Sequence, residues 1–149
     1  MRKYAGYINL SPINGVIYPS SLQNILLKDY VTNKLKSIFY LSPTEILQAR
    51  YSVTLNTLVS KETSVNGIVM LSTFSLPKNK TIRNKVFKEA LKMKKELHFI
   101  LDEKIFNNFE DLNEIEEQIL FNQEFFIKTK KKLNDVEKLI VKKNKISFV

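Results

Sequence analysis

The stretch Gly67 to Leu76, G-I-V-M-L-S-T-F-S-L, is an apolar run that ends among hydroxyl side chains. The run Tyr4 to Leu10, Y-A-G-Y-I-N-L, has the same character and is followed by Ser11. Buried parallel strands read as continuous apolar runs, and open α/β sheets bind ligands at the carboxyl ends of such strands. The two runs therefore predict a first and a third strand whose ends adjoin and form a crevice.

Outward from these runs, the apolar pattern alternates between strand-like and helix-like periods. Short apolar runs at 37–41 and 96–101 predict two further strands. Apolar residues at three- and four-residue spacing predict helices over 21–35, 47–59 and 81–93. This alternation predicts an α/β fold with a four-stranded, mostly parallel sheet flanked by helices.

The last third of the chain predicts one long helix. Between residues 109 and 143 there is no glycine or proline, and apolar residues recur at steps of seven: Leu112, Ile119, Phe126, Leu133 and Ile140. Such a repeat is the seam of a helix that packs lengthwise on another helix. We therefore expect an α/β domain at 1–105 and a helix with a basic tail at 106–149 that forms a homodimer. The alternative is that the helix folds back over its own domain.

Composition and charge limit the classes of protein. The chain has 149 residues, no cysteine and a formal net charge of +9, with arginine only at Arg2, Arg50 and Arg83. Without cysteine there is no disulfide framework, and we find neither a signal peptide nor an apolar segment of about 20 residues. We expect a soluble, cytoplasmic protein. Because arginine is the preferred ligand for phosphate and bases, we favour a solvated lysine surface over a dedicated nucleic-acid interface.

The order of elements resembles the catalytic domain of the serine recombinases, the resolvases and invertases. Tyr7, Leu10 and Ser11 stand where that family has its Tyr, Val and nucleophilic Ser, and Gln23 lies in the following helix. Asn9 replaces the arginine of the family motif, and the segment Ser72 to Pro77, S-T-F-S-L-P, contains neither the acid nor the arginines of the family's third-strand motif. The resemblance thus implies a resolvase-like fold, and a dimer, without the DNA-cleaving chemistry.

A second resemblance covers residues 2–103. Its motifs are R-x-x-x-G-Y-I from Arg2, Q-N-x-x-x-x-D-Y from Gln23, S-x-T-E from Ser42, G-I-V-x-x-S-x-F-x-L-P from Gly67 and E-L-H-F from Glu96. In this order they resemble the sporadic carbohydrate cluster family, small proteins encoded among genes for surface-glycan sugars. The resemblance implies a place in lipopolysaccharide or other surface-polysaccharide synthesis, and it implies no particular reaction.

Three residues are candidates for catalysis, and each has a structural alternative. Ser11 at a strand end is a possible nucleophile, or a turn or helix-capping residue. Glu45 is a possible acid or base, or the acid of a capping box with Ser42. His98 is a candidate general base, a role that a carboxylate such as Glu96 or Asp102 beside it would favour, or a hydrogen-bonded core or interface residue.

Polar residues at the strand ends and helix starts are the candidates for ligand binding. Hydroxyls in a buried strand must find partners, which makes the end of the third strand the best-supported position. The residues after the second strand could close over a ligand phosphate, or lie on the surface. The candidates are Asn9, Gln23, Asn24, Arg50, Tyr51, Ser72 and Thr73.

The favoured function is a small protein that binds or modifies a sugar or sugar nucleotide at this edge. One alternative is an inactive resolvase-like dimer that binds nucleic acid through lysines at 81–95 and 128–145. Another is a non-catalytic partner of a pathway enzyme. The three glycines cannot form a phosphate loop or a dinucleotide fingerprint, so no cofactor is predicted. One histidine and scattered carboxylates predict no metal site.

Overall fold

The computed structural model describes residues 1–45, 52–62 and 64–147, with side chains up to residue 143. The described residues form one five-stranded sheet of order β2-β1-β3-β4-β5. Four parallel strands are β1 (Lys3–Gly6), β2 (Ile38–Leu41), β3 (Gly67–Met70) and β4 (Glu96–Phe99). The fifth strand, β5 (Lys104–Phe106), pairs antiparallel with β4. The mostly parallel α/β fold is confirmed, and the prediction of four strands is wrong.

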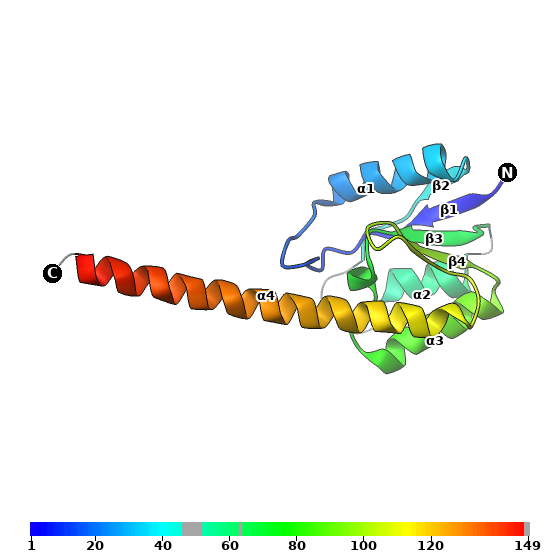
Figure 1. The fold of residues 1–149 in the computed structure, drawn as a ribbon. Coiled ribbons are helices and arrows are strands. Elements are labelled where there is room, and N and C mark those ends of the chain that lie inside the picture. The colour runs from blue at the N-terminus through cyan, green and yellow to red at the C-terminus, as the bar shows by residue number, and fades with distance from the viewer. Residues whose placement is uncertain (46–51, 63, 148–149) are drawn as a thin grey trace.

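Helices cover both faces of this sheet (Figure 1). On one face lies α1 (Ser20–Asp29), which continues as the π-helical turn η1 (Tyr30–Lys34). On the other face lie α2 (Val53–Ser60), α3 (Lys80–Lys92) and the first half of α4 (Asp111–Ser147). Residues 47–51 of the helix predicted over 47–59 lie outside the described residues.

Alternate residues of the central strand supply two separate cores. Val69 packs with Leu27 and Val31 beneath α1, whereas Ile68 packs with Leu55 and Phe87 beneath α2 and α3. All these side chains are almost fully buried. The two-residue period of a strand explains the division, since successive side chains point to opposite faces. Burial of β3 on both faces explains why its sequence is a continuous apolar run.

The two apolar runs, 4–10 and 67–76, are both longer than the strands they contain. β1 ends at Gly6 and β3 at Met70, yet Ile8, Leu71 and Leu76 beyond these ends are buried. The apolar runs therefore report burial rather than strand pairing. After β3 the chain turns through the short 3-10 helix η2 (Thr73–Ser75).

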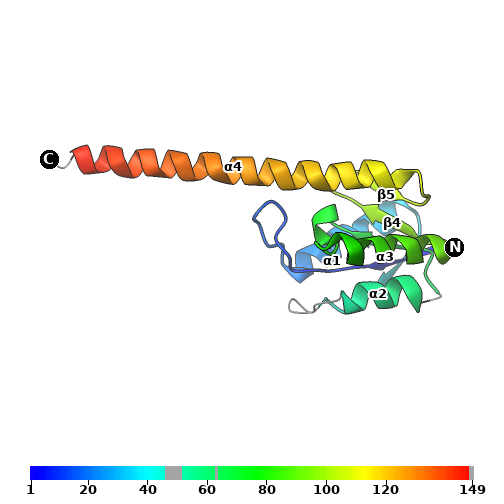
Figure 2. The ribbon, with the colours of Figure 1, turned by 90° about the horizontal axis from the view of Figure 1, so that it is seen from below.

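The 37-residue helix α4 lies against the domain only along its first half and then projects away from it (Figures 1 and 2). Ile115 and Ile119 are buried in the core and Phe126 is partly buried. Leu133 and Ile140 on the same seam are 60% and 54% exposed. The seven-residue seam is thus divided. Its first half packs on its own domain, as in the alternative, and only its second half is open to a partner.

Candidate functional site

The carboxyl ends of β1 and β3 lie side by side, because β1 pairs with both β2 and β3. The chain leaves β1 towards β2 on one side, and the later strands follow on the other. In open α/β sheets ligands bind at such a switch point. The pairing extends one step past β1, since the Tyr7 N–H donates to the Val69 carbonyl at 2.8 Å.

Asn9 joins three segments at this edge. Its Oδ1 accepts from the Ser11 N–H at 2.8 Å, and its Nδ2 donates to the Ser75 carbonyl at 3.2 Å. The Asn9 carbonyl accepts from Nε2 of Gln23 at 2.9 Å. With its side chain engaged at both ends, Asn9 positions the loop after β1 rather than offering an amide to a ligand.

Gln23 closes that loop at its other end and leaves one acceptor without a partner. Its Nε2 also donates to the Tyr18 carbonyl at 2.8 Å, so one amide ties together the two ends of the loop 9–18. Among the described residues, the buried Oε1 of Gln23 and Oδ1 of Asn24 have no hydrogen-bond partner. Buried amide oxygens need a donor such as water or a hydroxyl group.

Ser72 and Thr73 are held by a carboxylate from the turn between β4 and β5. The Ser72 hydroxyl donates to Asp102 at 3.0 Å, and the Thr73 N–H donates to the same carboxylate at 2.6 Å. Ser72 also accepts from the Phe74 N–H at 3.3 Å, so it caps η2. Being 1% exposed and fully partnered, Ser72 supports the strand end rather than binding a ligand.

Beyond η2 a cavity of about 530 Å³ opens between the segment 73–78, the loop tip 12–15 and α4. We call it the carboxyl-edge pocket. Phe74, Ile119 and Phe126 give it an apolar, largely aromatic wall. Its remaining lining residues are Pro12, Asn14, Gly15, Thr73, Leu76, Pro77, Lys78, Arg83, Asn122, Gln123, Ile127 and Lys130.

Polar groups in the pocket fall into two kinds. The Thr73 hydroxyl accepts from Nδ2 of Asn122 at 3.2 Å, and this bond holds the Asn122 side chain towards the end of β3. Lys78 and Lys130 carry positive charge, and in the described part of the chain neither lies within ion-pair distance of a carboxylate. Arg83 is different, since Glu116 and two backbone carbonyls engage its guanidinium. The pocket therefore offers two cations beside an aromatic wall.

Gly15 shapes the tip of the loop that closes the pocket. It adopts a φ of +80°, a conformation that side chains rarely accept. A Cβ built at this position would lie 3.1 Å from the Phe126 ring. Glycine thus lets the loop tip turn while lying against the aromatic wall.

Glu45 lies in a different, structural network. Its carboxylate accepts from the backbone N–H groups of Thr54 and Leu55, at 3.2 and 3.1 Å, in the first turn of α2. It also accepts from the Tyr7 hydroxyl at 3.0 Å. Burial and the Glu45 charge raise the pKa of Tyr7. Glu45 is therefore a buried helix cap, and Ser42 does not form a capping box with it, because its hydroxyl donates to the Gly6 carbonyl.

His98 belongs to a third network on the α1 side of the sheet. Its Nε2 lies 2.9 Å from Glu96, and its Nδ1 lies 2.9 Å from the Tyr30 hydroxyl. Because a carboxylate only accepts, Nε2 carries the proton and Nδ1 accepts from Tyr30. Burial lowers the pKa of His98 despite the neighbouring charge. Burial opposes ionisation of Glu96, but hydrogen bonds from His98, Tyr4 and Arg2 lower its pKa.

The predicted residues consequently do not form one catalytic group. Ser11 is joined through its backbone to Asn9, Glu45 caps α2, and His98 is bonded to Tyr30 and Glu96. Of the eight candidates that the structure describes, Thr73 alone lines the carboxyl-edge pocket. Arg50 and Tyr51 lie outside the described residues.

Sequence reasoning missed most of the pocket wall. Phe126 was assigned to a dimer seam, and Asn122 is a polar residue between the seam positions Ile119 and Phe126 whose partner, Thr73, is distant in sequence. Asn122 stands seven residues after the buried Ile115, and this change from apolar to polar is the signal that could have indicated a special environment. Lys78 and Lys130 carry no such signal, because lysine is frequent throughout the chain.

The described residues contain neither a metal-binding cluster nor a membrane-spanning helix. No cluster of three or more His, Asp or Glu side chains suited to a metal ion occurs in ranges 1–45, 52–62 and 64–147. Over the same part of the chain, no helix is both long and apolar enough to cross a membrane.

Comparison with models of protein families, with curated proteins and with solved structures found no match to this chain. The resemblances to the sporadic carbohydrate cluster family and to the serine recombinase fold therefore stay predictions. The geometry and charge of the carboxyl-edge pocket are the main guides to its function.

Proposed function

We propose that this protein binds a phosphorylated sugar or a sugar nucleotide in the carboxyl-edge pocket, as a cytoplasmic step in the synthesis of a bacterial surface polysaccharide. One observation carries the proposal: Lys78 and Lys130 line the same cavity as an aromatic wall. Neither lysine has a carboxylate partner among the described residues. Such a lining suits a ligand that has both an anionic group and a ring.

Each part of such a ligand has a counterpart in the pocket. The ammonium groups of Lys78 and Lys130 suit a phosphate or diphosphate. The rings of Phe74 and Phe126 suit the apolar face of a sugar or a base. Gln123 offers an amide group for ligand hydroxyls, whereas the Asn122 amide is engaged at both ends by Gln118 and Thr73. Among anionic ligands we choose sugars because of the family resemblance of residues 2–103.

The proposal is one of binding. The described residues that line the pocket include no carboxylate or imidazole, the groups that most often transfer protons in catalysis. The one arginine of the lining, Arg83, is already engaged by Glu116. A protein that holds a sugar intermediate for another enzyme fits this lining.

Titration calorimetry with UDP-glucose, glucose 1-phosphate and uridine tests the proposal. A charge-assisted hydrogen bond contributes about 1.5–3 kcal/mol, so Lys130→Gln should weaken binding of the two phosphorylated probes about tenfold or more. Lys131→Gln is the matched control, because Lys131 is a neighbour that does not line the pocket, and it should leave affinity unchanged. Equal losses in both variants, or binding of none of the probes, would refute the proposal.

A second candidate function rests on the lysines of α4. Eight lysines and only two acidic residues lie between 128 and 147. A surface of this kind suits the phosphate backbone of a nucleic acid. Binding of a 20-base-pair duplex that weakens steeply with added salt, together with no binding of UDP-glucose, would favour this function over the sugar pocket.

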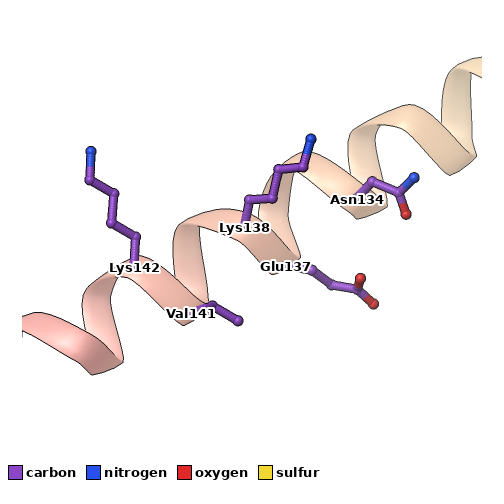
Figure 3. Close-up of a pocket in the computed structure, with 5 residues that line it drawn as sticks. All are labelled: Asn134, Glu137, Lys138, Val141 and Lys142. Carbon is purple, nitrogen blue, oxygen red and sulfur yellow. The ribbon is translucent and has the colours of Figure 1, made fainter.

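We also propose that the protein is a homodimer through the second half of α4. Val136, Leu139 and Ile140 are 51%, 67% and 54% exposed on this half, and Figure 3 shows five further side chains extending from the same helix. In sedimentation velocity the protein should be a dimer and Val136→Asp a monomer. Ile25→Asp, which alters an equally exposed residue of α1, should stay dimeric. A monomeric wild-type protein would exclude the dimer and favour a pathway enzyme as the partner, to be sought by co-purification.

A further inference from the structure

An exposed apolar stripe runs along the outer side of α4, away from the core. Phe121 and Phe125 are 63% and 56% exposed, and their rings stack with centroids 6.0 Å apart. At 100° per residue, these two side chains share a face of the helix with Val136 and Leu139, and Lys132 lies on the same face between the two apolar pairs. The buried residues Ile115 and Ile119 lie on a different face, about a quarter turn or more away. The stripe is therefore open to a partner while α4 stays packed on its own domain.

Charge is distributed unequally along the same helix. From residue 110 to 127 there are six acidic and no basic residues, whereas 128 to 147 carries eight lysines and two acidic residues. Complementarity to the helix dipole concerns only the first and last turns. It does not account for Lys128, Lys130, Lys131 and Lys132 at the middle of the helix. The division of charge instead suits a partner with the opposite gradient.

We infer that this partner is a second copy of the chain whose α4 runs antiparallel along the stripe. The inference rests on the proposed dimer and adds that the second half of each α4 packs along the outer side of the partner's first half, in antiparallel orientation. An antiparallel copy presents its basic half to the acidic half of the first, and a parallel copy in register would place like charges together. Symmetry doubles every contact of such a pair.

The spacing of residues fixes the register. With the two-fold axis beside residues 130–131, Phe125 lies opposite the partner's Val136, and Phe121 lies opposite the partner's Leu139 or the next residue. On one flank of the stripe, Glu117 then meets the partner's Lys142, and Glu124 meets the partner's Lys138. Lys128 meets the partner's Asp135 on the same flank. One register thus matches the aromatic pair with aliphatic side chains and forms three kinds of ion pair.

Cross-linking through single cysteines tests the orientation, because the chain has no cysteine of its own. Phe125→Cys and Val136→Cys are prepared separately, one with a mass tag, and treated with a short bis-maleimide alone and after subunit exchange. The mixture should give a covalent heterodimer, and each variant alone little product. Efficient cross-linking of each variant alone would show a parallel pair and overturn the inference.

Two further outcomes separate this inference from the dimer itself. A monomer in sedimentation with no cross-linking in any sample would exclude the dimer, whereas a stable dimer without the heterodimer product would exclude only the orientation.

Exchange of two charges between the helices gives a second readout of the orientation. Glu124→Lys and Lys138→Glu should each weaken the dimer several-fold, and the double variant should recover it. A double variant weaker than either single one would overturn the inference.

Discussion

The carboxylate of Glu116 on α4 accepts two hydrogen bonds from the guanidinium of Arg83 on α3, at 2.9 and 2.8 Å. Both side chains are largely buried, and the remaining Arg83 nitrogen donates to the carbonyls of Pro77 and Lys78. This pair therefore fastens the long helix to the domain and also fixes the segment that lines the pocket.

Neutralising Glu116 should loosen this attachment. Glu116→Gln leaves a buried guanidinium without its counter-charge, so we expect a loss of about 2–3 kcal/mol in the free energy of unfolding. Thermal unfolding at pH 7 should show a melting temperature lower by roughly 5–10 °C. Glu110→Gln, an exposed neighbour at the helix start, is the control and should change it little. An unaltered melting temperature of Glu116→Gln would contradict the role assigned to the pair.

Glu45 should affect stability rather than ligand affinity. Glu45→Ala removes the acceptor of three buried or partly buried donors, from Tyr7, Thr54 and Leu55, at a cost of about 1–3 kcal/mol. Urea unfolding should report the loss, and calorimetry with UDP-glucose at a temperature where the variant is folded should report unchanged affinity. A large loss of affinity in a fully stable variant would restore Glu45 as a site residue.

Ser72 and Ser11 should differ in their sensitivity to loss of the hydroxyl. Ser72→Ala removes a donor to Asp102 and an acceptor for the Phe74 N–H, so unfolding should become easier by about 1–2 kcal/mol. Ser11 is partly exposed and engaged through its backbone, so Ser11→Ala should stay within about 0.5 kcal/mol of the wild type. Equal effects of the two substitutions in urea unfolding would argue against this assignment.

His98 should make folding stability dependent on pH below neutrality. Burial lowers its pKa from the ordinary value of 6.5, so the unfolded chain binds a proton at a pH where the folded chain does not. The stabilising contribution is complete above pH 6.5 and is lost as the pH falls towards the lowered pKa. The melting temperature should therefore fall as the pH decreases below 6.5, and more steeply than in His98→Gln. Parallel pH profiles of the two proteins would exclude His98 as the source.

Much of the fold can be predicted from the periodicity of the sequence, and the exceptions have physical causes. Gly67 to Leu76 was correctly predicted to contain a third strand beside the first, but β3 ends at Met70, because an apolar run marks burial whether or not the strand continues. The strand β5 has only three residues, one of them exposed Ile105, which is too short for a period to show. The seven-residue repeat of α4 correctly predicted that one side of this helix is apolar and packs on another surface. The repeat does not tell whether that surface belongs to the same domain or to a second copy of the chain.

The candidate site was predictable only in its location. Asn9, Ser72 and Thr73 were expected at one edge, and they lie there. Their polar groups are mostly engaged by other residues of the domain: Ser11 and Ser75 bond the Asn9 side chain, and Asp102, distant in sequence, bonds Ser72 and Thr73. The charged pocket residues Lys78 and Lys130, which have no ion-pair partner in the described part of the chain, come from the loop after η2 and from α4. Whether these two segments lie side by side depends on the direction in which α4 leaves β5. No local pattern encodes that direction.

The continuous helix α4 connects the wall of the carboxyl-edge pocket to a distant end of the molecule. Ile119 and Phe126 line the pocket, and residues 128–147 continue the same helix for about 30 Å beyond the domain. The Arg83–Glu116 pair attaches the helix to the domain, and about 45 Å of helix separates Glu116 from residue 147. By simple geometry on that length, a tilt of about 5° about this pair displaces the end of the helix by about 4 Å. Any adjustment of the wall is therefore magnified at the far end of the chain.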